Sequence, residues 1–326
     1  MLYEYALEPE LVATWGDRRA GRYFADKFGL GSPRIVSRYP KRWKKLVWNA
    51  WERLQIDDNE MDHARMTELV EQLSEAMVRR TNTVANPDQS WLNNTTEEHQ
   101  RVPFHAILAR RNTAGHAGVL VADDLDDRTP LWTASRGVTI SRTATAIAGA
   151  VGNIMRIATE ITFIDPYFAP HHPRFRNVLE ACLTACFRGR VGDPPQIRIL
   201  SSDKNGADPT FFHSECRRHL PGVIPAELTV TVRRLKERAD GERLHNRYIL
   251  TEIGGVSFGV GLDEAQAPSS ATDDLHVLDR SQYEERWRQY SEGSLTFVSE
   301  HPISIAGTRR SPDSRPPGSP RVGSPA

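Results

Sequence analysis

The chain has 326 residues, of which 39% are hydrophobic and 26% are charged. Both fractions lie near the averages of globular proteins, so the composition excludes a fibrous chain and excludes disorder over most of the length. The 42 basic and 42 acidic residues give a formal net charge of +0, so any contact with a polyanion has to be local. The length favours two domains.

Neither a membrane-spanning segment nor a secretion signal is apparent. No apolar run reaches about eighteen residues, and MLYEYALEPE at the start lacks a basic and then apolar pattern. We therefore expect a cytoplasmic protein without a transmembrane segment. Three cysteines, Cys182, Cys186 and Cys216, cannot form a disulfide framework or a four-cysteine zinc site. We expect buried thiols, and we expect neither a metal nor a cofactor.

The first third of the chain is expected to be helical. WKKLVWNAWERL and ARMTELVEQLSEAMVRR carry apolar residues at spacings of three and four. TNTVANPDQSWLNNTTEEHQRVP is rich in Asn, Thr and Pro and lacks periodicity, which predicts a loop or a boundary. FHAILAR and GVLVADD follow as short apolar runs.

Helices and strands are expected to alternate after residue 140. TATAIAGAVGNIMRIATE has a small-residue helical pattern, ITFIDPYF reads as a strand, FRNVLEACLTACF as a helix and PPQIRILSSD as a strand. This alternation predicts a βαβ unit with parallel strands, whose polar ends share one edge of the sheet, where ligands tend to bind.

The last part of the chain predicts further strands and then a tail. ELTVTVRRLKE and RLHNRYILTEIGGVSFGVGL read as strands, the latter a pair separated by Gly254 and Gly255. GTRRSPDSRPPGSPRVGSPA holds mostly Pro, Ser, Gly and Arg, which predicts disorder. We therefore expect a helical N-terminal region over 1–112, an α/β domain over 113–306 and a disordered tail over 307–326.

The segment HNRYILTE is the most informative part of the sequence. It places an imidazole at His245, a permanent cation at Arg247 and a carboxylate at Glu252. Residues two apart in a strand face the same side, so His245 and Arg247 are expected to project together. A neutral imidazole can attack phosphorus, and a guanidinium can hold the non-bridging oxygens of a phosphodiester.

This segment resembles the phospholipase D superfamily, whose members carry His-x-Lys, four residues, Asp and then a glycine-rich strand. Here His-x-Arg is followed by four residues, Glu252 and GGVSFGVGLD, and FIDPYF also looks like the first half of that fold. The resemblance covers the stretch from about Ile140 to Phe297. It implies a mixed sheet flanked by helices, a metal-independent phosphodiesterase, a phospho-histidine at His245, phosphate held by Arg247, and a site that includes Glu252 and Asp165.

The sequence departs from that pattern in ways that leave alternatives open. Arg247 replaces Lys, Glu252 replaces Asp, and no convincing second copy occurs, although the family usually has two. One reading is a nuclease-like enzyme in which a homodimer pairs two copies, with a bacterial defence system as its setting. Another is a non-catalytic module that binds a partner protein or an anionic ligand. A lipid phosphodiesterase is the third.

A basic stretch with aromatic residues lies in the N-terminal region, from Ser37 to Trp51. Its cations are Arg38, Lys41, Arg42, Lys44 and Lys45. Basic residues beside aromatic rings can bind nucleic acid or an acidic partner protein. The simpler interpretation, which we favour, is an amphipathic helix with a solvated basic face and tryptophans in the core.

Overall fold

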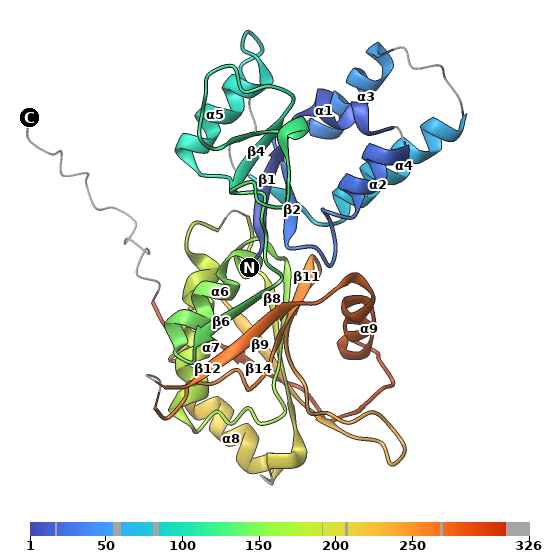
Figure 1. The fold of residues 1–326 in the computed structure, drawn as a ribbon. Coiled ribbons are helices and arrows are strands. Elements are labelled where there is room, and N and C mark those ends of the chain that lie inside the picture. Colours follow the sequence, from blue (N-terminus) through green and yellow to red (C-terminus); the bar gives the residue numbers. More distant parts are fainter. Residues whose placement is uncertain are drawn as a thin grey trace, which may run out of the picture.

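The computed structural model describes residues 1–16, 18–54, 60–80, 85–190, 192–205, 208–267 and 270–310. The chain forms two lobes, each built on its own β-sheet (Figure 1). The smaller, N-terminal sheet has five strands and the second sheet has nine. The expected α/β class with a mixed sheet flanked by helices is confirmed for the second lobe.

The first lobe has a parallel sheet with the strand order β3-β2-β1-β4-β5. Its strands are β1 (Tyr3–Leu7), β2 (Arg34–Arg38), β3 (Met77–Arg79), β4 (Ala106–Ala109) and β5 (Val119–Val121). Its helices are α1 (Pro9–Ala13), α2 (Arg18–Ala25), α3 (Trp43–Arg53), α4 (Glu60–Glu75) and α5 (Trp91–Arg101). The strand order reverses between β1 and β4, which is the point where ligands bind in many sheets of this kind.

That reversal point is closed by an ion pair. Glu8 follows β1 directly, and Pro9 begins α1. One carboxylate oxygen of Glu8 accepts the backbone N–H of Arg110 at 2.6 Å, and the other pairs with the Arg110 guanidinium at 3.3 Å. The first residue after β4 is thus tied to the first residue after β1.

The expectation of a purely helical region over 1–112 is corrected by this sheet. The helices are present, but strands alternate with them, and β5 of the same sheet lies beyond residue 112. β4 is buried along its whole length, and β2 is buried except at its last residue. A strand of four or five residues that is buried on both faces shows no polar alternation, so its sequence does not distinguish it from part of a helix.

Two further expectations are corrected. The predicted loop before residue 103 contains α5, whose first turn is capped by the Ser90 hydroxyl accepting the N–H of Asn93 at 3.1 Å. The predicted tail is ordered at its beginning, because Gly307 donates to Leu228 O at 2.9 Å and Arg309 donates to Ile224 O at 3.0 Å. The remainder, 311–326, lies outside the described residues.

The second sheet has the order β13-β9-β8-β7-β10-β11-β12-β6, and β14 also pairs with β9. Its strands are β6 (Gly137–Ser141), β7 (Glu160–Ile164), β8 (Gln196–Ser202), β9 (Thr229–Lys236), β10 (Arg247–Thr251), β11 (Gly254–Phe258), β12 (Thr272–Val277), β13 (Val298–Ser299) and β14 (Ile303–Ala306). β7, β8 and β9 are mutually parallel, and the other pairings are antiparallel. The predicted parallel pair β7–β8 and the predicted strand pair β10–β11 are confirmed. The turn expected at Gly254 and Gly255 lies instead at Glu252 and Ile253, and the two glycines begin β11.

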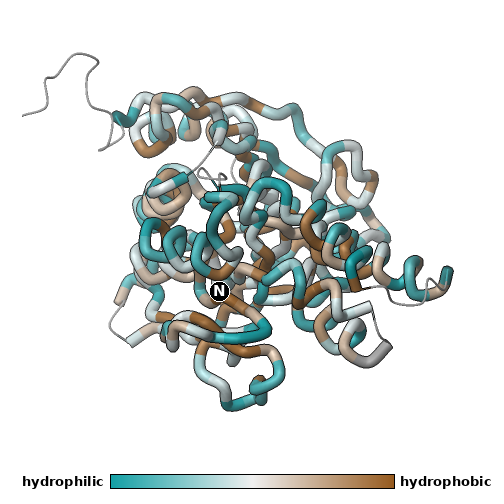
Figure 2. Tube along the Cα trace, turned by 90° about the horizontal axis from the view of Figure 1, so that it is seen from above, coloured by the Kyte–Doolittle hydropathy of each residue, from teal (hydrophilic) through white to brown (hydrophobic). Residues whose placement is uncertain are grey.

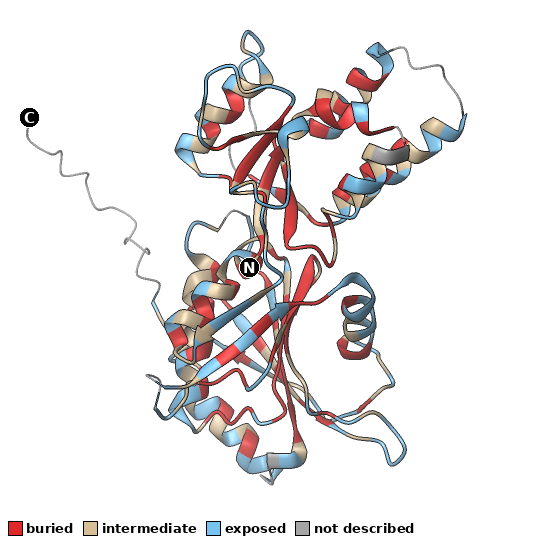
Figure 3. Cartoon of the chain, viewed as in Figure 1, coloured by how far each residue is buried: buried red, intermediate tan, exposed pale blue. Residues whose placement is uncertain are grey.

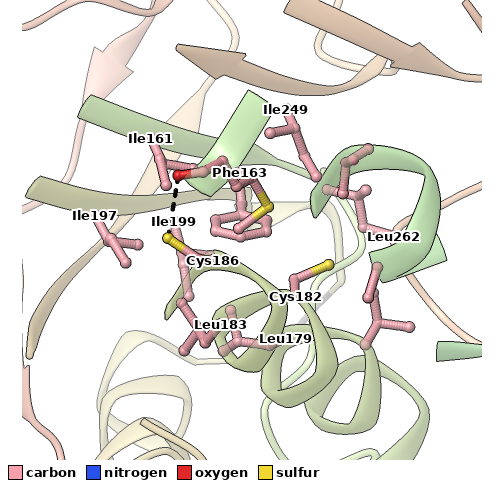
Figure 4. Close-up of a cluster of buried hydrophobic side chains, with 14 of the residues drawn as sticks. Ile161, Phe163, Leu179, Cys182, Leu183, Cys186, Ile197, Ile199, Ile249 and Leu262 are labelled. Carbon is pink, nitrogen blue, oxygen red and sulfur yellow. Dashed lines mark hydrogen bonds between the residues drawn. The ribbon is translucent and has the colours of Figure 1, made fainter. Parts of the chain in front are cut away.

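Helices cover both faces of the second sheet (Figure 1). The helices are α6 (Ala144–Ile157), α7 (Pro173–Phe187), α8 (Pro209–His219) and α9 (Arg280–Tyr290). α6, α7 and α8 share a hydrophobic cluster with one face, and α9 packs on the other through Tyr283 and Tyr290. The expected burial of the three cysteines is confirmed, and Figure 4 shows Cys182 and Cys186 of α7 facing the strands, with the Cys186 thiol 3.1 Å from Met155 O.

The two lobes share part of one core. Leu2, Ile35, Ala76 and Val78 of the first lobe belong to the same hydrophobic cluster as α6. Buried residues run along the central strands of both sheets, while β6, β12 and the outer sides of the helices carry exposed residues (Figure 3). Seen from above, the peripheral helices alternate hydrophobic and hydrophilic residues, as amphipathic helices do (Figure 2).

A buried ion network holds the first lobe together beside β3. Arg80 donates to Glu4 Oε1 at 2.8 Å and to Glu98 Oε1 at 3.1 Å, and its guanidinium lies 3.6 Å from the centre of the Phe104 ring. Arg80 and Glu98 have side chains 4% and 0% exposed. The network joins β1, the end of β3 and α5.

Replacing Arg80 with Met should lower the free energy of unfolding by about 3–5 kcal/mol, because two carboxylates then lack their buried partner. Urea denaturation followed by circular dichroism measures this change. Arg65→Met is the matched control, because Arg65 pairs with Asp62 at a site where its side chain is 41% exposed, and its loss should cost less than about 1 kcal/mol. Equal costs for the two variants would contradict the assigned role of the network.

Candidate anion-binding site

Strand register places Arg247 opposite Asp165. β10 and β7 are antiparallel with Tyr248 paired to Ile164, so the next position pairs Arg247 with Asp165. In the same strands Ile249 and Phe163 face the cluster under α6 and α7. Since side chains alternate along a strand, Arg247 and Asp165 project to that same face, at the carboxyl end of β7.

A cavity of about 400 Å³ opens at this end of the sheet. Most of its polar lining is charged, with three guanidinium groups and three carboxyl groups. The lining residues are Arg142, Asp165, Tyr167, Arg174, Phe175, Arg247, Val260, Gly261, Asp263, Glu264, Ala265 and Gln266. The cavity therefore has the size and the charged groups to take a small anion or one end of a larger ligand.

Asp165 is the buried acid of the cavity, with 3% of its surface exposed. Its Oδ1 accepts the N–H of Tyr167 and its Oδ2 accepts the N–H of Leu262, each at 2.8 Å. Burial raises the pKa of Asp165, although these two hydrogen bonds and the nearby Arg247 charge act in the opposite direction. The carboxyl group thus keeps its proton to a higher pH than an exposed aspartate does.

Asp263 holds two of the three arginines in place. Its Oδ1 accepts from Arg142 at 2.5 Å, and its Oδ2 lies 3.3 Å from Arg174 Nε. Arg142 precedes α6 and Arg174 lies in the first turn of α7, so one carboxylate links the starts of two helices. Two cations therefore share this one carboxylate, and Glu264 of the lining adds a second carboxylate nearby, whose Oε1 accepts the N–H of Ala144 at 2.9 Å.

Arg247 is the arginine of the cavity that is left for a ligand. In the described part of the chain its guanidinium has no hydrogen-bond partner, and its Nε is buried without one. The guanidinium lies 5.2 Å from the centre of the Tyr167 ring. The side chain is half-buried, and a buried Nε without an acceptor is costly unless a ligand supplies one, so Arg247 is a candidate position for a bound anion.

The glycine string after β11 allows its loop to close over Asp165. A Cβ atom on Gly261 would lie 2.5 Å from Asp263 Oδ1 and 3.6 Å from Asp165 Oδ2. Any side chain there would push the two carboxylates apart. The Gly-Leu-Asp string at residues 261–263 is therefore a packing requirement of this site.

His245 is not part of the cavity lining, although it lies two residues before Arg247 in the chain. It is exposed and precedes the first residue of β10 by two positions. Its Nδ1 is 3.3 Å from Arg243 O, which favours a proton on Nδ1 and leaves the Nε2 lone pair free. An extended chain places His245 about 7 Å from Arg247 along the strand direction.

Glu252, the other residue of the predicted motif, lies at the opposite end of β10. Its carboxylate accepts the N–H of Thr159 at 2.7 Å and the N–H of Glu160 at 3.0 Å. These contacts tie the β10–β11 turn to the start of β7. The structure thus brings Asp165 and Arg247 together in the cavity lining, and it keeps His245 and Glu252 out of that lining.

The loop that carries His245 is fixed by two residues that the sequence pattern did not single out. Glu237 Oε1, at the end of β9, accepts the N–H of Leu244 at 2.6 Å and also pairs with Lys204. Lys204 in turn donates to Leu244 O at 3.3 Å. The Glu237 carboxylate therefore binds the backbone N–H of Leu244, and the Lys204 ammonium group binds its C=O, which fixes the residue before His245.

The basic stretch lies in the first lobe. Trp43 and Trp51 of α3 are buried, and the Trp43 indole donates to Leu7 O at 2.7 Å. The cations of the stretch are solvated, because Lys41, Arg42, Lys44 and Lys45 are exposed and Arg38 donates to Lys41 O. The interpretation of an amphipathic helix with core tryptophans is confirmed, and binding of nucleic acid by its basic face remains a prediction.

The described residues include neither a cluster of metal ligands nor a helix that could cross a membrane. Within the described ranges, no group of three or more His, Cys, Asp and Glu side chains is placed to hold a metal ion. Among the same residues, no helix combines the length and the apolar character that crossing a membrane requires.

Comparisons with known structures return distant matches. No protein-family model matches the sequence, and neither does any curated protein. Nuc from Salmonella typhimurium, a phospholipase D family member, is 9% identical, with 51% of this chain and 97% of Nuc covered at a TM-score of 0.32. TrmBL2, an archaeal chromatin protein, is 12% identical, with 48% of this chain and 53% of TrmBL2 covered at a TM-score of 0.25. Both TM-scores are low, so residue roles and activity do not carry over from either protein.

Arg247→Gln should weaken the binding of inorganic phosphate by about 10- to 150-fold, because a charge-assisted hydrogen bond contributes about 1.5–3 kcal/mol. Isothermal titration calorimetry measures the affinity. Arg188→Gln is the control, because Arg188 is exposed at the opposite end of α7 from the cavity. Undiminished phosphate binding by the Arg247 variant would rule out this guanidinium as the anion ligand.

Proposed function

We propose that the second lobe is a phospholipase D-like phosphodiesterase that acts on nucleic acid. In this proposal a phosphate group of the substrate enters the arginine-lined cavity, and His245 attacks it. The observation that carries the proposal is the half-buried guanidinium of Arg247, whose Nε is buried without a described hydrogen-bond partner and which lies two residues from an imidazole with a free Nε2.

The chemistry proceeds in two displacements. The Nε2 lone pair of His245 forms a bond to phosphorus, and the ester bond to the leaving oxygen breaks. Arg247 holds the non-bridging oxygens, where negative charge grows during the attack. Water then breaks the nitrogen–phosphorus bond, which releases the phosphate product and restores the imidazole.

The leaving oxygen needs a proton, and Asp165 is suited to supply it. Asp165 lines the cavity opposite Arg247, and burial raises its pKa, so its carboxyl group stays protonated to a higher pH than usual. A second His245 in a homodimer is the other source of this proton. If Asp165 is the source, its loss should slow DNA cleavage. If the second His245 is the source, the loss of Asp165 should leave DNA cleavage unchanged.

His245→Ala should reduce hydrolysis of single-stranded DNA to the uncatalysed rate, because no other group in the proposal forms the bond to phosphorus. Phosphate affinity should stay within about threefold of the parent, since Arg247 is unchanged. Gel electrophoresis of DNA incubated with a chelator, and acid-quenched trapping of phosphorylated protein, provide the measurements. His301→Ala, at an exposed histidine outside the cavity lining, is the control. Hydrolysis that survives in the His245 variant would refute the assignment of the nucleophile.

Asp165→Asn should slow cleavage of DNA by about 10²–10⁴-fold, which is the usual contribution of a general acid. Cleavage of bis(p-nitrophenyl) phosphate should change little, because p-nitrophenolate leaves without a proton. With the parent protein, DNA cleavage should decline as the pH rises through the raised pKa of Asp165, whereas p-nitrophenolate release should not. Unchanged DNA cleavage in the Asp165 variant would favour the homodimer as the proton source, and equal losses on both substrates would contradict Asp165 as the general acid.

A non-catalytic anion-binding module is the second candidate function. It is favoured by one observation, which is that His245 is exposed and lies outside the cavity lining. A protein of this kind would bind phosphate through Arg247 and would not form phospho-histidine. Phosphate binding together with a negative trapping experiment would identify it.

A further inference from the structure

Two aromatic rings are exposed near the cavity. Tyr167 is 46% exposed and Phe211 is 48% exposed. Tyr167 lines the cavity, and Phe211 lies at the start of α8, with its ring 5.7 Å from that of His171 on the loop that also carries Tyr167. Exposed rings of this kind are available to stack on flat groups of a ligand.

The Tyr167 ring is held in place beside the phosphate ligand. Its backbone N–H is fixed by Asp165, and the Arg247 guanidinium lies 5.2 Å from the ring centre. One guanidinium thus contacts the ring and also offers hydrogen bonds to an anion. A group that binds here can place a phosphate on Arg247 and a flat ring system against Tyr167 at the same time.

A nucleotide within a single strand has this combination of groups. Its base is attached to the sugar next to the phosphate, and unpaired bases stack on exposed aromatic rings. In a duplex the same bases are already stacked on their neighbours. A lipid surface is a weaker match, because the large hydrophobic side chains that the cavity lining exposes are Val260 and Tyr167. Two such side chains offer little apolar area to a membrane.

We propose that this site takes single-stranded nucleic acid, with one base stacked on Tyr167 beside the phosphate held by Arg247, and with Phe211 and His171 extending the stacking surface by a further base. This inference rests on the phosphate-binding part of the proposed function and is independent of hydrolysis. Tyr167 is then a specificity-determining residue.

The test measures binding of fluorescein-labelled oligothymidylate by anisotropy, with the full chain carrying His245→Ala so that the strand stays intact. Tyr167→Ala should weaken binding by about tenfold or more, as loss of one stacked base does. Tyr167→Phe should bind as the parent does, because it keeps the ring. Phe211→Ala should weaken binding less. A matched abasic oligomer should bind equally to the parent and to Tyr167→Ala.

Tyr23→Ala controls for the loss of any exposed tyrosine, because Tyr23 is 40% exposed on α2 in the other lobe. The inference is overturned if Tyr167→Ala binds oligothymidylate as the parent does, if it loses the abasic oligomer to the same extent, or if a duplex binds as tightly as the single strand. Binding to phosphatidylserine vesicles without binding to oligothymidylate would also overturn it.

The outcomes separate this inference from the proposed function. Ring-dependent binding without cleavage by the unmodified chain would leave the inference standing and remove the hydrolysis. Suppose instead that cleavage of bis(p-nitrophenyl) phosphate depends on His245 and that binding of oligothymidylate does not depend on the Tyr167 ring. The proposed hydrolysis would then stand, and the stacking inference would be removed.

Discussion

The second lobe depends on one cross-strand pair, the half-buried Arg247 opposite the buried Asp165. Arginine stays charged at every relevant pH, so its buried Nε at the end of β10 favours an anion nearby. Asp165 meets only part of that need, because its two oxygens already accept backbone N–H groups and burial favours its protonated form. The rest of the site follows from an arginine whose charge the protein itself leaves incompletely balanced.

The other charged groups reach this pair from distant parts of the sequence. Arg142 comes from the start of α6, Arg174 from α7, and Asp263 from the loop after β11. A single carboxylate that binds both arginines fixes three elements relative to one another. Because these contacts lie at the mouth of the cavity, the same interactions that order the loops also set the distance between its cations.

The sequence predicted most of the second lobe, and for a definite reason. α6, β7, α7 and β8 are long or strongly patterned, and Asp165 stands at the end of an evident strand. Arg142 and Arg174 escaped notice because nothing in their spacing relates them to Arg247, and only the folded sheet brings them together. In the first lobe β2 and β4 are short and almost wholly buried, so neighbouring strands rather than local pattern decide their structure.

The ion pair between Glu8 and Arg110 has a consequence for the first lobe. Dinucleotide-binding sheets with this strand order place a glycine-rich turn and free backbone N–H groups after the first strand. Here that position holds a carboxylate, followed by Pro9, which has no N–H to donate. A pyrophosphate approaching the crevice would meet a negative charge and too few donors. Despite its strand order, this lobe is electrostatically unsuited to hold a nucleotide cofactor at that crevice.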